Sequence, residues 1–326
     1  MADITLSVVI PCYDRLDLLE RTLRAAVAQI VPEGIGWEVI VADNHPQTLA
    51  RALVEGIAAN AAVPVIHVAA LPARNISSAR NAGVNAARGS FVAFSDDDEA
   101  PLPNWLAEHH ACLLRTGADA SFGPKYPEFE GGKPPSWDPN GYYYTVDFKL
   151  PADTELRPLD WWPPQGRGLG TGNSMMRKAT CLPGPAPFDE VFGRTGGEDS
   201  MLLFNLSKSG RRFVWCPAAV VIEYNQLGRL AVDYMRQRLR RSAQHSAECR
   251  AAVADHKMLA RAAITAVGLA QLGVHGVLWM LSSKADEVKR TKHWLGIAKG
   301  IGKLRKGKPL NFVPERREAA TAPAEN

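Results

Sequence analysis

The sequence predicts an α/β protein with a mostly parallel central sheet flanked by helices, followed by a basic helical appendage. Over residues 4–115, short β-branched runs alternate with segments whose apolar residues recur at helical spacing. Such alternation is typical of βαβ units, in which each helix crosses between two parallel strands. Charge separates the two parts, because residues 1–200 hold 16 Lys+Arg against 25 Asp+Glu, whereas residues 201–326 hold 22 against 9. The basic C-terminal part is therefore expected to meet an anionic partner.

Length and composition limit the classes of protein to which the chain can belong. The chain has 326 residues, 46% hydrophobic and 22% charged, which suits one large domain plus an appendage and excludes wholesale disorder. Its five cysteines are scattered and form no C-x-x-C pair. This favours reduced thiols in the cytoplasm over a disulfide framework or a zinc cluster. The first apolar run ends at Pro11, after too few residues for a signal peptide.

The individual elements follow from periodicity and turn residues. Strands are expected at residues 4–10, 37–42, 63–68 and 91–94. Helices are expected at residues 16–30, 47–59, 77–87, 102–115 and 199–208. Asp14 is the expected N-cap of the first helix, and Gly89 stops the third. In parallel sheets ligands bind beyond the C-terminal ends of the strands, so polar residues at those ends are the candidates for a site.

An unusual run of acids, Asp96-Asp97-Asp98-Glu99, follows the fourth predicted strand. Four consecutive carboxylates repel one another, so an ordered loop of this kind favours a bound cation. Hard divalent cations take oxygen ligands and bridge to substrate phosphates. The alternative is a solvated acidic turn. The position at the end of a strand favours the metal interpretation.

Several short motifs occur in a fixed order and carry a resemblance. They are residues 7–15 (SVVIPCYDR), 41–44 (VADN), 78–83 (SARNAG), 87–89 (ARG), 94–99 (FSDDDE), 170–177 (GTGNSMMR) and 196–199 (GGED). Together they resemble family 2 glycosyltransferases of the GT-A fold, and among these the bacterial exopolysaccharide glucosyltransferases of the succinoglycan type. Each motif alone is weakly specific, whereas five or more in order over residues 4–245 are strongly specific.

The resemblance implies donor-binding and metal-binding residues. The donor, expected to be a UDP-hexose, would be bound by Pro11, Tyr13, Arg15, Asp43, Arg80, Asp96 and Asp97. Asp98, with Asp96, would hold Mg²⁺ or Mn²⁺ bridging the diphosphate, and the fork of Arg80 would suit phosphate. Two alternatives stay open: Asp43 could instead form an Asx turn with Asn44, and Arg80 could be a surface charge.

The resemblance also implies the catalytic and acceptor residues. Asp199 would be the general base of an inverting displacement and Glu198 would position the acceptor, although both acids also suit a helix N-terminus. The acceptor side would include Gly172, Asn173, Trp161 and Trp162. The tryptophans, like the run Tyr142-Tyr143-Tyr144, are either sugar platforms or, more often, packing. Arg236, Arg238 and Arg240 would belong to the arginine-rich helix near the diphosphate.

Two departures from the family pattern bear on these roles. Asp14 stands where many members have Asn, and Glu223 stands where the family often has a His. If that position binds metal in the family, Glu223 would replace the His as an oxygen ligand.

The domain organisation is expected to be a catalytic domain at residues 1–225, a basic helical membrane-associating region at 226–310 and a disordered tail at 311–326. Residues 262–281 have the length of a membrane span but contain three polar groups and three glycines. An interfacial or re-entrant helix is therefore favoured over a full crossing, and a buried core helix is the other alternative. Nine Lys+Arg lie within residues 284–308, a cluster that suits anionic lipid headgroups.

These features predict a protein at the inner face of the cell membrane, with a nucleotide-sugar donor and a glycan or lipid-linked acceptor. Nucleic acid is not an expected partner, because the first 200 residues are acidic. An oxidoreductase is disfavoured because the first strand–helix turn contains no glycine. No P-loop, G-x-S-x-G or H-E-x-x-H sequence is present. The remaining alternative is a non-catalytic sugar- or nucleotide-binding protein that retains the fold.

Overall fold

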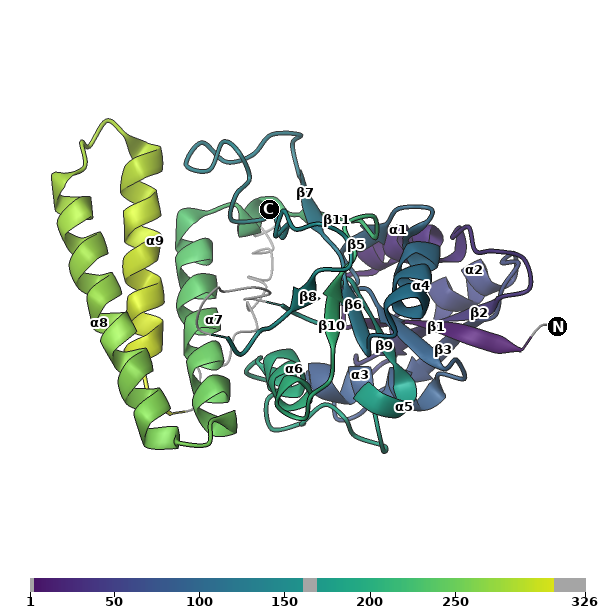
Figure 1. The fold of residues 1–326 in the computed structure, drawn as a ribbon. Helices are drawn as coiled ribbons and strands as arrows, with labels where there is room; N and C mark the ends of the chain where they lie inside the picture. The colour runs from purple at the N-terminus through teal and green to yellow at the C-terminus, as the bar shows by residue number, and fades with distance from the viewer. Residues whose placement is uncertain (1–2, 161–168, 308–326) are drawn as a thin grey trace, which may run out of the picture.

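The computed structural model describes residues 3–160 and 169–307 and shows an α/β domain with three long helices beside it (Figure 1). An eight-stranded sheet has the order β3-β2-β1-β4-β9-β6-β10-β8, and a smaller sheet has the order β5-β11-β7. Parallel pairing joins β3, β2, β1 and β4, and also β6 and β10. The predicted fold class is confirmed.

The strands are β1 (Ile4–Cys12), β2 (Gly36–Asp43), β3 (Val65–Ala69), β4 (Phe91–Phe94), β5 (Glu99–Pro101), β6 (Ala120–Phe122), β7 (Lys125–Phe129), β8 (Glu155–Leu156), β9 (Ser174–Arg177), β10 (Phe213–Trp215) and β11 (Val221–Asn225). The helices are α1 (Leu16–Val27), α2 (Arg51–Ala58), α3 (Ile76–Ala86), α4 (Trp105–Thr116), α5 (Lys178–Cys181), α6 (Glu198–Lys208), η1 (Leu227–Arg229), α7 (Val232–Val253), α8 (Lys257–Leu281) and α9 (Glu287–Leu304).

The core lies on both faces of the large sheet, because side chains alternate along each strand. Val8 and Ile10 of β1 pack with Leu19 of α1 in one cluster. Val9, between them in sequence, packs on the other face with Val84 of α3. A side chain on Gly83 would collide with Val9, so the glycine permits α3 to lie close against β1.

Strand β9 gives the sheet its mixed character. It lies between β4 and β6 and is antiparallel to both, with Ser174 opposite both Phe94 and Phe122. The segment that enters β9 therefore meets the C-terminal ends of β4 and β6. This arrangement brings Gly172 and Asn173 to the loop that follows β4.

Several predicted helix boundaries were wrong by a few residues. Asp14 does not cap α1, since Arg15 occupies the N-cap position and no side chain caps the helix. The helix predicted from residue 47 begins at Arg51, because Thr48 has a φ of 46° and interrupts helical geometry. The third helix, by contrast, is capped by Asn75, whose side chain accepts a hydrogen bond from the Ser78 N–H.

The three C-terminal helices pack together, with α9 against both α7 and α8 and with α8 outermost in Figure 1. Glycines permit this close packing: Gly302 faces the carbonyl of Arg240, and Gly300 faces the carbonyl of Gly268. Helix α8 is the one helix in the described residues that is long and apolar enough to cross a membrane. Only 11% of its most apolar window is buried, so α8 is not a buried core helix.

Candidate active site

A polar cavity of 370 Å³ lies where the C-terminal ends of β4 and β6 meet α6 and α7. Its lining includes the carboxylates of Asp96, Glu99, Asp199 and Glu223, together with Lys125. Helix α7 contributes Arg238, Arg241, Ser242, His245 and Ser246 to the same lining. The cavity thus gathers the acidic loop, the start of α6 and a basic helix that are far apart in the sequence.

Arg80 links the two acidic motifs. Its guanidinium donates to Asp96 Oδ1 at 3.1 Å and pairs with the Glu198 carboxylate. Arg80 and Glu198 are both buried, so Arg80 is not the surface charge that was its alternative interpretation. Burial and the neighbouring Asp199 raise the pKa of Glu198 to about 7, against the effect of Arg80. The fork of Arg80 is occupied by two carboxylates, which fixes α6 relative to the acidic loop.

A second buried ion pair joins Lys125 of β7 and Glu99 of β5. Glu223 lies opposite Glu99 in the small sheet. Burial raises the pKa of Glu99 to about 8, although Lys125 opposes this. A Cβ atom on Gly172 would lie 2.7 Å from both Asp96 Oδ2 and Lys125 Nζ, so only glycine leaves room for these charged groups.

Asp98 is held by two arginines. Its Oδ2 accepts hydrogen bonds from Arg15 Nη1 at 2.6 Å and Arg229 Nη1 at 2.7 Å. Burial acts to raise the pKa of Asp98, but the two guanidinium groups hold it below its usual value. Asp97 also pairs with Arg15 and is buried away from the cavity, and burial raises its pKa to about 7. Neither carboxylate is among the residues that line the cavity.

The donor set of this loop fits a divalent cation that is bound together with a phosphate ligand. Among the residues that the structure describes, no group of three His, Cys, Asp or Glu side chains forms a preassembled metal site. Mg²⁺ usually takes one or two carboxylates and completes its shell with water and substrate phosphates. Asp96, whose side chain is 32% exposed at the cavity, could supply one such carboxylate. Asp98 Oδ2 already accepts hydrogen bonds from Arg15 and Arg229, so Asp98 could supply a second only if these contacts changed.

Asp199 opens onto the cavity from the first turn of α6. Gly196 and Gly197 precede it with φ values of 84° and 98°, a left-handed turn that glycine adopts at little cost. His245 packs on this turn, 3.1 Å from the place of a Cβ on Gly196. Asp199 Oδ1 accepts a hydrogen bond from the Ser200 N–H at 2.6 Å, and Oδ2 faces Gly170. Unlike Glu198, this carboxylate makes no ion pair with any described residue.

The loops after β1, β2 and β3 form a separate part of the same sheet edge. Tyr13 accepts a hydrogen bond from Arg74 Nε at 2.7 Å, and its ring lies 5.1 Å from that of His45. Asp43 is completely buried, and its carboxylate accepts from the N–H groups of His45 and Ala50. The Asx turn considered for Asp43 is therefore present. Pro11 is buried near the C-terminal end of β1.

The acceptor-side residues differ in their roles. Asn173 has a φ of 55°, and its amide is used within the fold by Pro124, Ala219, Trp105 and His109. Trp161 and Trp162 lie outside the described residues. Tyr143 and Tyr144 line the cavity and also pack on Trp137, so packing and cavity lining coincide there.

The predicted arginine helix is α7, but its arginines point in different directions. Arg238 lines the cavity, whereas Arg236 stacks on Trp294 of α9 at 4.8 Å and pairs with Asp233. Arg240 is not among the cavity-lining residues. The diphosphate role predicted for Arg236 and Arg240 is not compatible with these positions. Sequence reasoning missed His245, which the spacing 238, 241, 245 along one helix face would have indicated.

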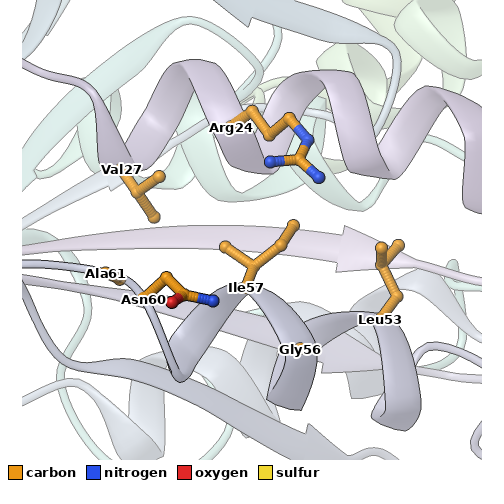
Figure 2. Close-up of a pocket in the computed structure, with 7 residues that line it drawn as sticks. All are labelled: Arg24, Val27, Leu53, Gly56, Ile57, Asn60 and Ala61. Carbon is orange, nitrogen blue, oxygen red and sulfur yellow. The ribbon is translucent and has the colours of Figure 1, made fainter.

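A second hollow, of 380 Å³, lies between α1 and α2 (Figure 2). Val27, Leu53 and Ile57 give it an apolar lining. Its one charged residue, Arg24, already pairs with Glu20 on the same helix. The hollow therefore brings no reactive group together, and the polar cavity is the candidate active site.

An α/β sheet whose strand ends bring an acidic loop and a Glu-Asp helix start to one cavity is the arrangement expected of a glycosyltransferase of the GT-A fold. The family model described as glycosyl transferase family 2 matches residues 7–181. The chain belongs to glycosyltransferase family 2, and it is a glycosyltransferase.

Individual relatives agree with this assignment. The succinoglycan biosynthesis protein ExoM of Rhizobium meliloti (strain 1021) is 32% identical over 233 residues, which is 72% of this chain and 71% of that protein. Mannosyltransferase PcManGT from Pyrobaculum calidifontis, solved with GDP-Man and Mn²⁺, has a TM-score of 0.57 at 17% identity and covers 92% of this chain and 86% of its own. TarS 1–349 of S. aureus with UDP-GlcNAc has a TM-score of 0.52 at 16% identity, with 91% of both chains covered. These two structures share the fold.

Proposed function

We propose that this enzyme transfers a hexose from a nucleotide-sugar donor, a UDP-hexose, to a hydroxyl of a glycan or lipid-linked acceptor. The transfer inverts the configuration at the anomeric carbon. The observation that carries this proposal is the position of Asp199, a carboxylate without an ion-pair partner among the described residues, in the same cavity as Asp96. Synthesis of an exopolysaccharide or other cell-surface glycan is supported by the likeness to ExoM, named as a succinoglycan biosynthesis protein.

The proposed reaction is a single displacement. The acceptor hydroxyl attacks the anomeric carbon, Asp199 accepts the hydroxyl proton, and the nucleoside diphosphate leaves from the opposite face. Glu198 acts indirectly, because its pairing with Arg80 fixes the start of α6 and thereby the carboxylate of Asp199. Asp43 is proposed to organise the uridine-side loop, on which Tyr13 and His45 offer ring faces to a base.

The proposed cofactor is Mg²⁺ or Mn²⁺, held by Asp96 and Asp98 together with the donor diphosphate. When bound, the ion supplies positive charge that stabilises the leaving diphosphate. Arg15 and Arg229, which neutralise Asp98, are then available to the phosphates. The Mn²⁺ and GDP-Man bound by PcManGT, which shares the fold, support this proposal.

A panel of nucleotide-sugars tests the proposed donor class. Purified protein is expected to release UDP from a UDP-hexose slowly with water as acceptor, and to do so only in the presence of Mg²⁺ or Mn²⁺. Released nucleoside diphosphate is measured for UDP-, GDP- and ADP-sugars at equal concentration. Release from a GDP-sugar alone would overturn the choice of UDP, and equal release in excess chelator would overturn the metal.

We also propose that residues 226–310 hold the enzyme on the inner face of the cell membrane through α8. Its exposed apolar side chains include Leu269, Val274 and Val277. No charged residue lies between Arg261 and Lys284, and exposed lysines follow at the start of α9. An apolar helix face beside a basic cluster suits an interfacial position on anionic lipid. The 311–326 tail lies outside the described residues.

Vesicle flotation tests the membrane proposal. The chain is expected to float with vesicles containing anionic phosphatidylglycerol at low salt and to float less at high salt, because screening weakens each lysine contribution of about 1 kcal/mol. A Leu269→Glu/Val277→Glu double variant should remain at the bottom of the gradient. Leu114→Glu, at an exposed position on α4, is the matched control and should float like the wild type. Equal flotation of all three proteins would contradict a role for α8.

A further inference from the structure

The turn that leads to Asp199 has little internal support. Gly196 and Gly197 both lie in the left-handed region, and Gly197 is the N-cap of α6. No described side chain caps this end of α6 with a hydrogen bond. Glycine has more backbone freedom than any other residue, so groups outside the turn must fix its shape. Because Asp199 is in the first turn of α6, those groups also fix the direction of its carboxylate.

His245 of α7 packs on both glycines. A Cβ atom on Gly196 would lie 3.1 Å from His245 Cε1, and one on Gly197 would lie 3.2 Å from His245 Cβ and 3.3 Å from Cγ. His245 is buried, and its Nε2 has no hydrogen-bond partner among the described residues. The ring therefore supports the turn through close packing.

Cys249, one helical turn further along α7, supports the same turn from the same helix face. Its Sγ donates a hydrogen bond to the Gly197 carbonyl at 3.6 Å. Burial, followed by the nearby carboxylates of Asp199 and Glu198, raises the pKa of Cys249 to about 12, so at neutral pH the thiol keeps its proton. Burial, followed by Arg241, lowers the pKa of His245 to about 4, so its ring is neutral. The two side chains thus support the turn without adding charge beside Asp199.

Helix α7 is itself anchored along α6. Cys249 and Val253 pack with Phe204 of α6 in one buried cluster. The guanidinium of Arg250 lies 5.2 Å from the centroid of the Phe204 ring, and Lys208 Nζ at the end of α6 donates to the Val253 carbonyl at 2.6 Å. These contacts extend from the start of α6 to its last residue, so α7 holds the whole of α6 in place.

We propose that His245 and Cys249 are positioning residues for Asp199, because they hold the Gly196-Gly197 turn in the conformation that directs the carboxylate into the cavity. This inference rests on the proposed function, in which Asp199 is the base, and it adds a role for one face of α7. Neither side chain needs to contact a substrate for this role. A base that is displaced by about 1 Å can slow the reaction by roughly 10²-fold, while the donor site at the Asp96 loop stays unchanged.

His245→Ala is expected to lower kcat at least about tenfold and to change the UDP dissociation constant less than about twofold. His245→Asn keeps Cβ, Cγ and an atom in the place of Nδ1, which are the atoms nearest Gly197, so it should restore kcat to within about threefold of the wild type. The value of kcat is measured at saturating donor, and the dissociation constant by calorimetry.

Gln244→Ala is the matched control. Gln244 precedes His245 and is also buried, but its amide donates to the Gly307 carbonyl and it is not among the residues that line the cavity. Its kcat and UDP affinity should equal those of the wild type. If His245→Ala weakens UDP at least about tenfold with an unchanged kcat, His245 belongs to the donor site and the inference is overturned. It is also overturned if His245→Asn is as slow as His245→Ala, since the imidazole itself would then take part in the reaction.

Hydrogen exchange at the Met201 amide, which donates to the Gly197 carbonyl at 2.9 Å, tests the turn independently of turnover. Exchange should be at least about tenfold faster in His245→Ala and unchanged in Gln244→Ala. If the wild type transfers no sugar, the proposed function fails, and this measurement still decides whether His245 holds the turn: equal exchange in all three proteins would overturn the inference.

Thermal unfolding of each variant, within a few degrees of the wild type, excludes a folding defect. If His245→Ala unfolds at a markedly lower temperature, Cys249→Ala replaces it, because that variant removes the hydrogen bond to Gly197 and little volume. It should lower kcat at least about threefold, and an unchanged kcat would overturn the inference.

Discussion

Asp199→Asn is expected to lower kcat by roughly 10²–10⁴-fold, the usual contribution of a general base. The amide preserves the shape of the side chain and its hydrogen bond from the Ser200 N–H, but it cannot accept a proton from the acceptor. Donor binding should change little, because Asp199 lies on the α6 side of the cavity and not in the Asp96 loop. Turnover is measured at saturating donor, and the UDP dissociation constant is measured separately.

The role of Asp199 is decided by whether the Asp199→Asn substitution lowers kcat or weakens the binding of UDP. Loss of UDP affinity with an unchanged rate at saturation would make Asp199 a donor ligand and remove it as the base. Asp255→Asn is a suitable control, because Asp255 is an exposed carboxylate that pairs with Lys208 just before α8 and is not among the residues that line the cavity. Its activity should equal that of the wild type.

Asp98→Ala is expected to abolish transfer, with a loss of roughly 10³-fold or more. Metal stabilisation of the leaving group is worth several kcal/mol, and each 1.36 kcal/mol corresponds to about a factor of ten in rate. The variant also removes one of the two carboxylates that pair with Arg15 and the nearer of the two that pair with Arg229. Asp98→Asn, which keeps the volume of the side chain, separates loss of charge from loss of packing and should be nearly as inactive.

Binding of Mn²⁺ provides a second measurement of the same site. Because the described residues contain no preassembled metal site, the free wild type should bind Mn²⁺ weakly and the UDP complex about tenfold or more tightly. Electron paramagnetic resonance of free Mn²⁺ measures both affinities. Asp98→Asn should lose the increase that UDP produces. Full activity of Asp98→Ala in excess chelator would remove Asp98 from the metal site.

The sequence alone determined the sheet edge at which the candidate active site lies. Strand and helix periodicity is local, and the C-terminal ends of parallel strands meet at one edge by geometry, so acids after the fourth strand had to lie there. The Gly196-Gly197 turn before Asp199 was also predictable, because only glycine adopts φ values near 90° at little cost. Asp96 and Asp199 do share a cavity, as the motif order had suggested.

Only the tertiary structure decided how the charged groups pair. Arg229 holds Asp98 although 131 positions separate them in the chain, and Arg80, which bonds Asp96, pairs with Glu198 across 118 positions. Such pairs depend on distances of a few ångströms between elements, which no local pattern encodes. The same holds for α7, where helical rotation turns Arg238 into the cavity and Arg236 toward Trp294. The motifs therefore locate the candidate site, and packing between distant elements decides which of their charged side chains face its cavity.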